Sequence, residues 1–140
     1  MTINKELILE GANKGLITTW ELAKVLIPTT IIISLLQASG YLDALARFTG
    51  PFMGYMGLPG EAAVVLFTGF FLGMYAAVGA MVVLPLTLTE MTILAVMLSL
   101  CHSLIVELAI NKKAGTAISL ILPIRLGTCL LAGFILGGIL

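Results

Sequence analysis

Three ionisable side chains stand inside two strongly apolar segments of this chain. His102 and Glu107 lie in the segment 91–110, and Arg125 lies in the segment 117–140. Each segment is long enough to cross a bilayer, where an ionisable group is costly and usually marks a substrate or ion path. The three residues therefore predict a binding site of the transport type. They do not indicate which solute the site takes.

Two serines extend this polar group. On a regular helix, Ser99, Ser103 and Glu107 are four residues apart and share one face, with His102 beside them. In the functional interpretation, His102 and the serines hydrogen-bond a solute, and Glu107 accepts from a hydroxyl or amine or binds a cation. In the structural interpretation, Glu107 reaches the membrane interface and His102 caps a neighbouring backbone group. The sequence leaves both interpretations open.

Arg125 also has two interpretations. Its guanidinium stays protonated, so it either pairs with Glu107 or completes a site for an anionic group. Pro123, two residues earlier, frees a backbone carbonyl, which is common where a transporter helix is broken. The sequence alone does not decide between an ion pair and a ligand contact.

No residue pattern typical of an enzyme or a metal site stands out. The chain has one histidine, and Cys101 and Cys129 are too far apart in sequence for the usual spacing of metal ligands. We interpret both cysteines as small packing residues. We therefore expect no enzymatic activity, no catalytic residue, no metal site and no cofactor. A coupling ion such as Na⁺ or H⁺ is compatible with a transporter.

The composition identifies an integral membrane protein. Hydrophobic residues make up 60% of the chain and charged residues 10%, whereas about a quarter of a soluble domain is charged. The mean hydropathy is +1.17. The net charge of zero and the absence of a basic patch give no reason to expect a nucleic-acid partner. The first twenty residues contain four charges and no apolar core, so we do not expect a signal peptide.

The elements that position the polar residues follow from hydropathy and from glycine and proline. Residues 3–20 alternate apolar and charged residues at helical spacing, which predicts an amphipathic interfacial helix. We place this helix in a region 1–22 and a single membrane domain in 23–140. The predicted spans are 23–42, 91–110 and 116–138, with a short interfacial helix at 43–57.

The segment 62–86 allows two interpretations. It is long enough to cross the membrane once, but glycine and alanine interrupt its centre. Alternatively, it enters and leaves on the same side as a re-entrant hairpin, with its tip over Gly73, Met74, Tyr75 and Gly79. Half-helix ends at the tip would face a ligand. The structural interpretation of these glycines is close helix packing.

The distribution of lysine and arginine favours the hairpin. Four true spans would place three basic residues on each side and would set no orientation. With a re-entrant hairpin, only Arg47 lies opposite the amino terminus. The five on the amino-terminal side are Lys5, Lys14, Lys24, Lys112 and Lys113. We therefore predict an all-α integral membrane protein of the inner (cytoplasmic) membrane, with three transmembrane helices, one re-entrant hairpin and a cytoplasmic amino terminus.

The order of these elements resembles a known family. An amphipathic start with GANKG, a span, a short helix ending in GLPGEA (57–62) and a Gly/Ala-rich hairpin resemble the nucleoside-recognition, or Gate, domain. That domain occurs in spore maturation proteins, ferrous-iron transporters and concentrative nucleoside transporters. The run CHSLIVE (101–107) is similar to an HSL-x-x-E run in some members. The resemblance covers about residues 8–138.

The resemblance implies an architecture and a function. The core of concentrative nucleoside transporters contains two repeats of opposite orientation, and this chain resembles one of them. Such repeats enclose a midplane site between them. The resemblance implies transport of a small polar solute, nucleoside-like or other, by an obligate dimer of half-transporter subunits in membrane lipid. From their polarity, their spacing and the predicted hairpin tip, we expect the substrate-binding residues to be His102, Ser103, Glu107, Ser99, Arg125, Gly73, Met74, Tyr75 and Gly79.

The sequence does not decide between two possible partners, and it allows a second function. The partner is either a homologous Gate-type subunit of reversed charge bias or a second copy in an antiparallel homodimer, and the charge count favours the first. The alternative function is a non-transporting membrane assembly or sensor subunit that works through a homologous partner.

Overall fold

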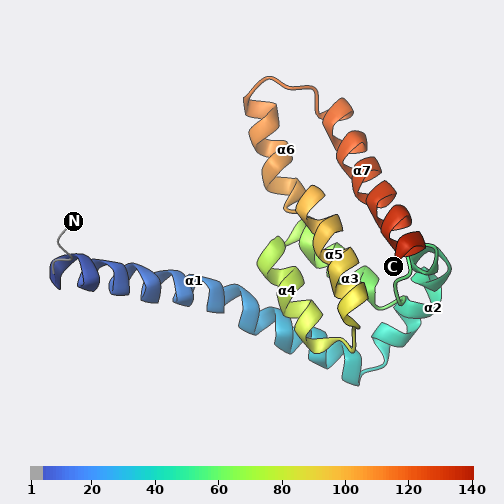
Figure 1. The fold of residues 1–140 in the computed structure, drawn as a ribbon, viewed down its shortest axis with the longest axis horizontal. Coiled ribbons are helices and arrows are strands. Elements are labelled where there is room, and N and C mark those ends of the chain that lie inside the picture. Colours follow the sequence, from blue (N-terminus) through green and yellow to red (C-terminus); the bar gives the residue numbers. More distant parts are fainter. Residues whose placement is uncertain (1–4) are drawn as a thin grey trace.

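The computed structural model describes residues 5–140, which form seven α-helices and, within that range, no strand (Figure 1). The helices are α1 (Lys5–Ala38), α2 (Tyr41–Gly54), α3 (Ala62–Phe71), α4 (Met74–Val83), α5 (Leu88–Leu100), α6 (Leu104–Lys113) and α7 (Ile118–Ile139). The prediction of an all-α membrane protein is confirmed.

Three helical stretches are long and apolar enough to cross a membrane: Glu6–Ala38, Leu88–Lys113 and Ile118–Ile139. Helices α3 and α4 have ten residues each, a length of about 15 Å. The hydrocarbon core is about 30 Å thick, so neither helix can cross it alone. The segment 62–86 therefore forms a helical hairpin whose two helices pack against each other. Its entry from one side of the membrane stays a prediction.

Helix α1 is one helix where the sequence predicted two. The expected interfacial helix (3–20) and first span (23–42) join without a break, and the division between 1–22 and 23–140 falls inside α1. Ion pairs within the helix, such as that between Lys24 and Glu21, support the helical conformation across this region. The first two residues of the predicted helix, 3 and 4, lie outside the described residues. Figure 1 shows the amino-terminal part of α1 extending away from the other helices.

The core lies where α3, α4, α5, α7 and the turn after α2 meet. Its largest fully buried side chains are Met56, Ile93, Leu94, Met97, Leu98, Val65, Cys101 and Cys129. Both cysteines are free thiols, as expected of packing residues. Helix α7 approaches the turn closely because Gly133 has no side chain. A Cβ there would lie 2.7 Å from the Met56 sulfur and 2.8 Å from the Met97 sulfur.

Two backbone discontinuities lie beside this core. The first is the tip of the α3–α4 hairpin at Gly73. The second separates α5 from α6 at residues 101–103. The predicted span 91–110 lies within the apolar stretch Leu88–Lys113. It is not one regular helix, because the backbone is broken at residues 101–103, as described below.

Candidate functional site

The break between α5 and α6 is built from one extended and one left-handed residue. Cys101 is extended, with φ −146° and ψ 98°. Ser103 has φ 50° and is the only non-glycine residue of positive φ in residues 5–140. This conformation is unfavourable by about 1–2 kcal/mol for an L-residue, so it persists only where the surroundings hold it. The Ser103 backbone N–H donates to the Gly69 carbonyl at 2.9 Å, which fixes the break to the hairpin.

The hairpin tip contains fewer residues than the sequence predicted. The N–H groups of Leu72 and Gly73 both donate to the Thr68 carbonyl, at 2.8 and 3.0 Å, and α4 starts at Met74. Gly73 has φ 106° and ψ 173°, a conformation open essentially to glycine alone. Gly79 lies inside α4 and not at the tip. A Cβ on Gly79 would lie 3.4 Å from the Cβ of Thr29, an ordinary contact distance, so Gly79 lies where α4 packs against α1.

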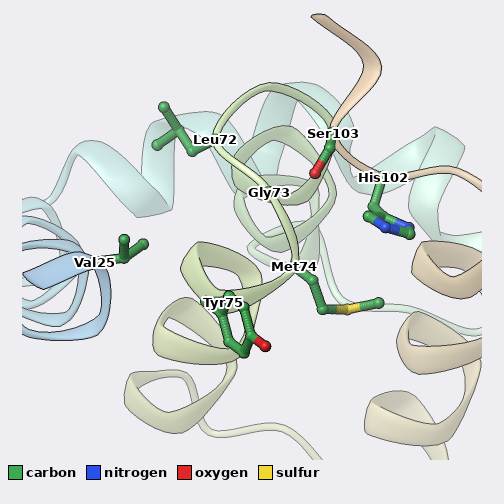
Figure 2. A pocket seen from close by; sticks show the side chains of 7 residues that line it. All are labelled: Val25, Leu72, Gly73, Met74, Tyr75, His102 and Ser103. Carbon is green, nitrogen blue, oxygen red and sulfur yellow. The ribbon is translucent and has the colours of Figure 1, made fainter. Parts of the chain in front are cut away.

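The tip and the break lie next to each other, and both line a cavity of about 460 Å³ (Figure 2). The residues that line it are Val25, Leu72, Gly73, Met74, Tyr75, His102 and Ser103. The structure thus brings together Gly73, Met74, Tyr75, His102 and Ser103 from the predicted set. Val25 and Leu72 were missed because an apolar side chain in an apolar segment gives no chemical signal in the sequence.

The cavity is bordered by the amino-terminal ends of two half-helices. Helix α4 begins after Gly73 and α6 begins after Ser103, and neither end carries a side-chain cap from the described residues. The first N–H groups of a helix lack partners within it and carry a partial positive charge. Figure 2 shows the Ser103 hydroxyl directed toward Gly73. A Cβ on Gly73 would lie 3.1 Å from that oxygen.

The His102 side chain lines the cavity and also contacts the end of α5. Its Nδ1 lies 2.9 Å from the Leu98 carbonyl oxygen. A carbonyl only accepts, so Nδ1 carries the proton, and in the neutral imidazole Nε2 is then an acceptor. The structural interpretation of His102 as a backbone cap is thus observed. The same ring lines the cavity, where it contributes acceptor capacity beside the donors of the half-helices.

Besides Gly79, three predicted residues lie outside the cavity lining. The Ser99 hydroxyl donates to the Val96 carbonyl at 2.7 Å, on an exposed face of α5. Because the helix is broken at 101–103, Ser99 no longer shares a face with Ser103 and Glu107. Glu107 and Arg125 form an ion pair with each other, so the paired interpretation describes their geometry. Direct contact of either with a solute stays a prediction.

Other features of the described residues do not compete with this site. No group of three or more His, Cys, Asp or Glu residues in the described part of the chain is placed to hold a metal ion. A second cavity of about 510 Å³ lies between α1, α2 and α3, and its lining is almost entirely aliphatic and aromatic. The two threonine hydroxyls in that lining, Thr49 and Thr68, donate to backbone carbonyls. The cavity at the tip and the break is therefore the candidate site for a polar solute.

Comparison with known proteins agrees with this architecture. Residues 19–117 match the Gate family, described as nucleoside recognition. No solved structure matches the chain. The membrane protein YvoD of Bacillus subtilis (strain 168) is 41% identical over 132 residues, which cover 94% of this chain and 42% of YvoD. The inner membrane protein YjiG of Escherichia coli (strain K12) is 36% identical over 75 residues, which cover 53% of this chain and 48% of YjiG.

The chain thus spans less than half the length of these relatives. The family match covers α2 to α6 and part of α1, and so includes the hairpin, the break and the cavity between them. This chain belongs to the Gate (nucleoside recognition) family of membrane proteins.

Proposed function

We propose that this chain is one subunit of a membrane transporter for a small polar solute, with the solute bound at the cavity between the hairpin tip and the broken helix. The observation that carries the proposal is the contact of two discontinuities, at Gly73 and Ser103, beside one cavity. Transporters place their substrate sites at such discontinuous helices because the backbone groups there are free to bind a ligand.

The chemistry of the cavity suits a neutral, hydroxyl-bearing solute such as a nucleoside. The half-helix ends offer N–H donors, Ser103 offers a hydroxyl, and His102 offers an acceptor at Nε2. Tyr75 and Met74 supply apolar surface for a ring. The volume of about 460 Å³ falls in the range of about 300–1,000 Å³ that is typical of small-molecule sites. The family description of nucleoside recognition supports a test with nucleosides first.

A second Gate-type subunit completes the site in this proposal. Leu72 and Tyr75 line the cavity yet are 66% and 53% exposed, so much of the lining faces outward in a single chain. A homologous half placed opposite would cover them and enclose the solute. YvoD matches this chain over only 42% of its length, which leaves room in that protein for a second unit. We propose a heteromeric pair in the inner membrane, with the amino terminus of this chain in the cytoplasm.

Solute binding is tested by thermal unfolding of the purified subunit, alone and with its partner, against nucleosides, amino acids and sugars. A solute that binds the folded state raises the unfolding temperature. We expect stabilisation of the wild type and of Ser99→Ala, whose hydroxyl donates to the Val96 carbonyl and does not line the cavity. We expect Ser103→Ala to lose it. If the solute stabilises both variants equally, it binds outside this cavity.

Uptake into proteoliposomes separates transport from the sensor or assembly function. Accumulation of a solute that stabilises the protein, lost in Ser103→Ala and retained in Ser99→Ala, supports transport. Binding at the same cavity without any movement of solute would reject transport and favour a sensor. Reconstitution of the chain alone and with its partner would show whether the second subunit is required.

A further inference from the structure

We propose that Arg125 is a positioning residue that ties the two half-helices α5 and α6 together across their break, and so holds His102 and Ser103 at the cavity. The structural part of this proposal is independent of transport. Its consequence for solute binding rests on the proposed function.

One guanidinium contacts both sides of the break. Arg125 Nε donates to the carbonyl of Leu100, the last residue of α5, at 3.3 Å. Its terminal nitrogen pairs with the carboxylate of Glu107, in the first turn of α6. Arginine suits this role because it presents five donors in a rigid planar fork. A lysine has a single ammonium group at the end of a flexible stem.

The end of α5 needs donors because the break removes them. The last carbonyls of a helix have no partner within it, and unsatisfied carbonyls are costly in an apolar environment. The Met97 carbonyl accepts from the Cys101 N–H at 3.0 Å, and the Leu98 carbonyl accepts from His102. Arg125 supplies the donor for Leu100. Helix α7 thus replaces part of the hydrogen bonding that a continuous α5–α6 helix would provide for itself.

Helix α6 needs an anchor because little of it packs against the protein. Of its ten described residues only Leu104 is buried, whereas Ile105 and Val106 are about 60% exposed. Helix α7 is the available support, since it packs along α5, where Gly133 lies against Met97. Figure 1 shows α6 leaving the hairpin region beside α7. The Ser103–Gly69 hydrogen bond and the Glu107–Arg125 pair are the polar contacts that fix its direction.

The pair is shielded enough to persist in a membrane. The side chains of Arg125 and Glu107 are 30% and 24% exposed. Loss of one partner would leave an unpaired charge in an apolar region, which is strongly unfavourable. A single neutral substitution could therefore disturb folding for a reason unrelated to the break. The test uses a double variant that removes both charges.

The measurement is the distance distribution between spin labels at Thr92 on α5 and Ile110 on α6, both exposed, in the full chain in lipid nanodiscs. The native cysteines are buried, and label uptake by the unsubstituted chain serves as the blank. We expect one narrow distribution in the wild type and in Lys112→Gln, which removes an exposed charge from the same helix. We expect a broad distribution in the double variant Glu107→Gln/Arg125→Gln.

Arg125→Lys is the second variant. It keeps a cation for Glu107 but cannot hold Leu100 at the same time, so we expect an intermediate width. If the double variant fails to fold, Arg125→Lys still gives the decisive comparison with Lys112→Gln. A distribution as narrow as that of the wild type in every folded Arg125 variant would overturn the proposal.

Solute affinity is measured on the same samples with a nucleoside that stabilises the wild type. We expect affinity to fall by about tenfold or more in the double variant, a loss of about 1.4 kcal/mol, because His102 and Ser103 are then no longer held at the cavity. The two proposals can fail separately. A broadened distance in a protein that binds and moves no solute would reject transport and leave Arg125 as the tie. An unchanged distance in a protein that transports would reject the tie alone.

Discussion

The backbone N–H of Ser103 donates to the carbonyl of Gly69 at 2.9 Å, and this bond joins the broken helix to the hairpin. Ser103 lies at the start of α6 and Gly69 lies near the end of α3, so the bond links elements that are far apart in sequence. Gly69 lets α3 pack closely against α5 and α4 because it lacks a side chain. A Cβ there would collide with the Leu98 side chain and lie 3.2 Å from the Ala77 Cβ. Both site elements are therefore parts of one packed unit.

The hairpin tip depends on glycine at position 73. We expect Gly73→Ala to lower the free energy of unfolding by about 1–3 kcal/mol, because its φ of 106° is strained for any residue with a Cβ. The new methyl group would also lie 3.1 Å from the Ser103 hydroxyl oxygen. Thermal or denaturant unfolding in detergent measures the change. Gly127→Ala is the control, because no described atom outside the local helix lies within 4 Å of a Cβ there. Equal stability of the two variants would contradict this account of the tip.

The contact of α7 with the turn after α2 gives a second prediction, tested at two adjacent glycines. A Cβ on Gly137 would collide with the backbone carbonyl of Met56, whereas one on Gly138 meets open space among the described residues. Backbone cannot move aside as a flexible side chain can. We therefore expect Gly137→Ala to destabilise the protein by about 1–3 kcal/mol.

Gly138→Ala should be neutral or slightly stabilising, because alanine favours helix over glycine. The two variants differ by one position on the same helix, so the comparison removes effects of composition and detergent. If both variants unfold at the temperature of the wild type, α7 does not pack against the turn in this way.

Much of the fold is readable from the sequence because hydropathy and glycine content determine it locally. The three long apolar stretches follow from hydropathy, and the distribution of lysine and arginine favoured a hairpin over a single span at 62–86. The continuity of α1 was missed because the change from charged to apolar residues near residue 22 alters the environment of the helix and not its backbone. The interfacial helix predicted at 43–57 corresponds to α2, which ends at Gly54.

The site was only partly predictable, since its backbone geometry comes from contacts distant in sequence. Nothing in CHSLIVE marks Ser103 as left-handed, because serine is not a residue that favours positive φ. The break depends on Gly69, more than thirty positions earlier. The regular-helix assumption therefore grouped Ser99 with Ser103. The polar residues themselves were found because polarity in an apolar segment is visible without any structure.

The two roles of His102 can be separated by substitution. The imidazole donates to the Leu98 carbonyl and leaves Nε2 as an acceptor beside the cavity. An asparagine amide can donate to the same carbonyl but places no acceptor where Nε2 lies. We expect His102→Asn to unfold close to the wild-type temperature and to lose solute stabilisation. His102→Ala should lose about 1 kcal/mol of stability as well, because the carbonyl then lacks a donor.

A different result for His102 would be equally informative. Retention of solute stabilisation in His102→Asn would make the histidine a backbone cap alone. Loss of stability in His102→Asn equal to that in His102→Ala would mean that the amide does not replace the imidazole. In that case, solute binding by the two variants could not be compared.

The topology of the chain is the last prediction and the one on which the paired arrangement depends. Because α3 and α4 are too short to cross and three stretches are long enough, we predict that positions 47 and 112 lie on opposite sides of the membrane. Single cysteines at Arg47 and Lys112, both exposed, are placed in a chain that lacks Cys101 and Cys129. An impermeant thiol reagent applied to intact cells should label position 47 and not position 112, because a fixed orientation with a cytoplasmic amino terminus follows from the positive-inside rule.

Labelling of both positions from outside would mean that the hairpin crosses the membrane, and the half-transporter arrangement would be wrong. Partial labelling of both would show a chain inserted in two orientations. The partner would then be a second copy of this chain, because antiparallel pairing within one population supplies both halves of an inverted repeat.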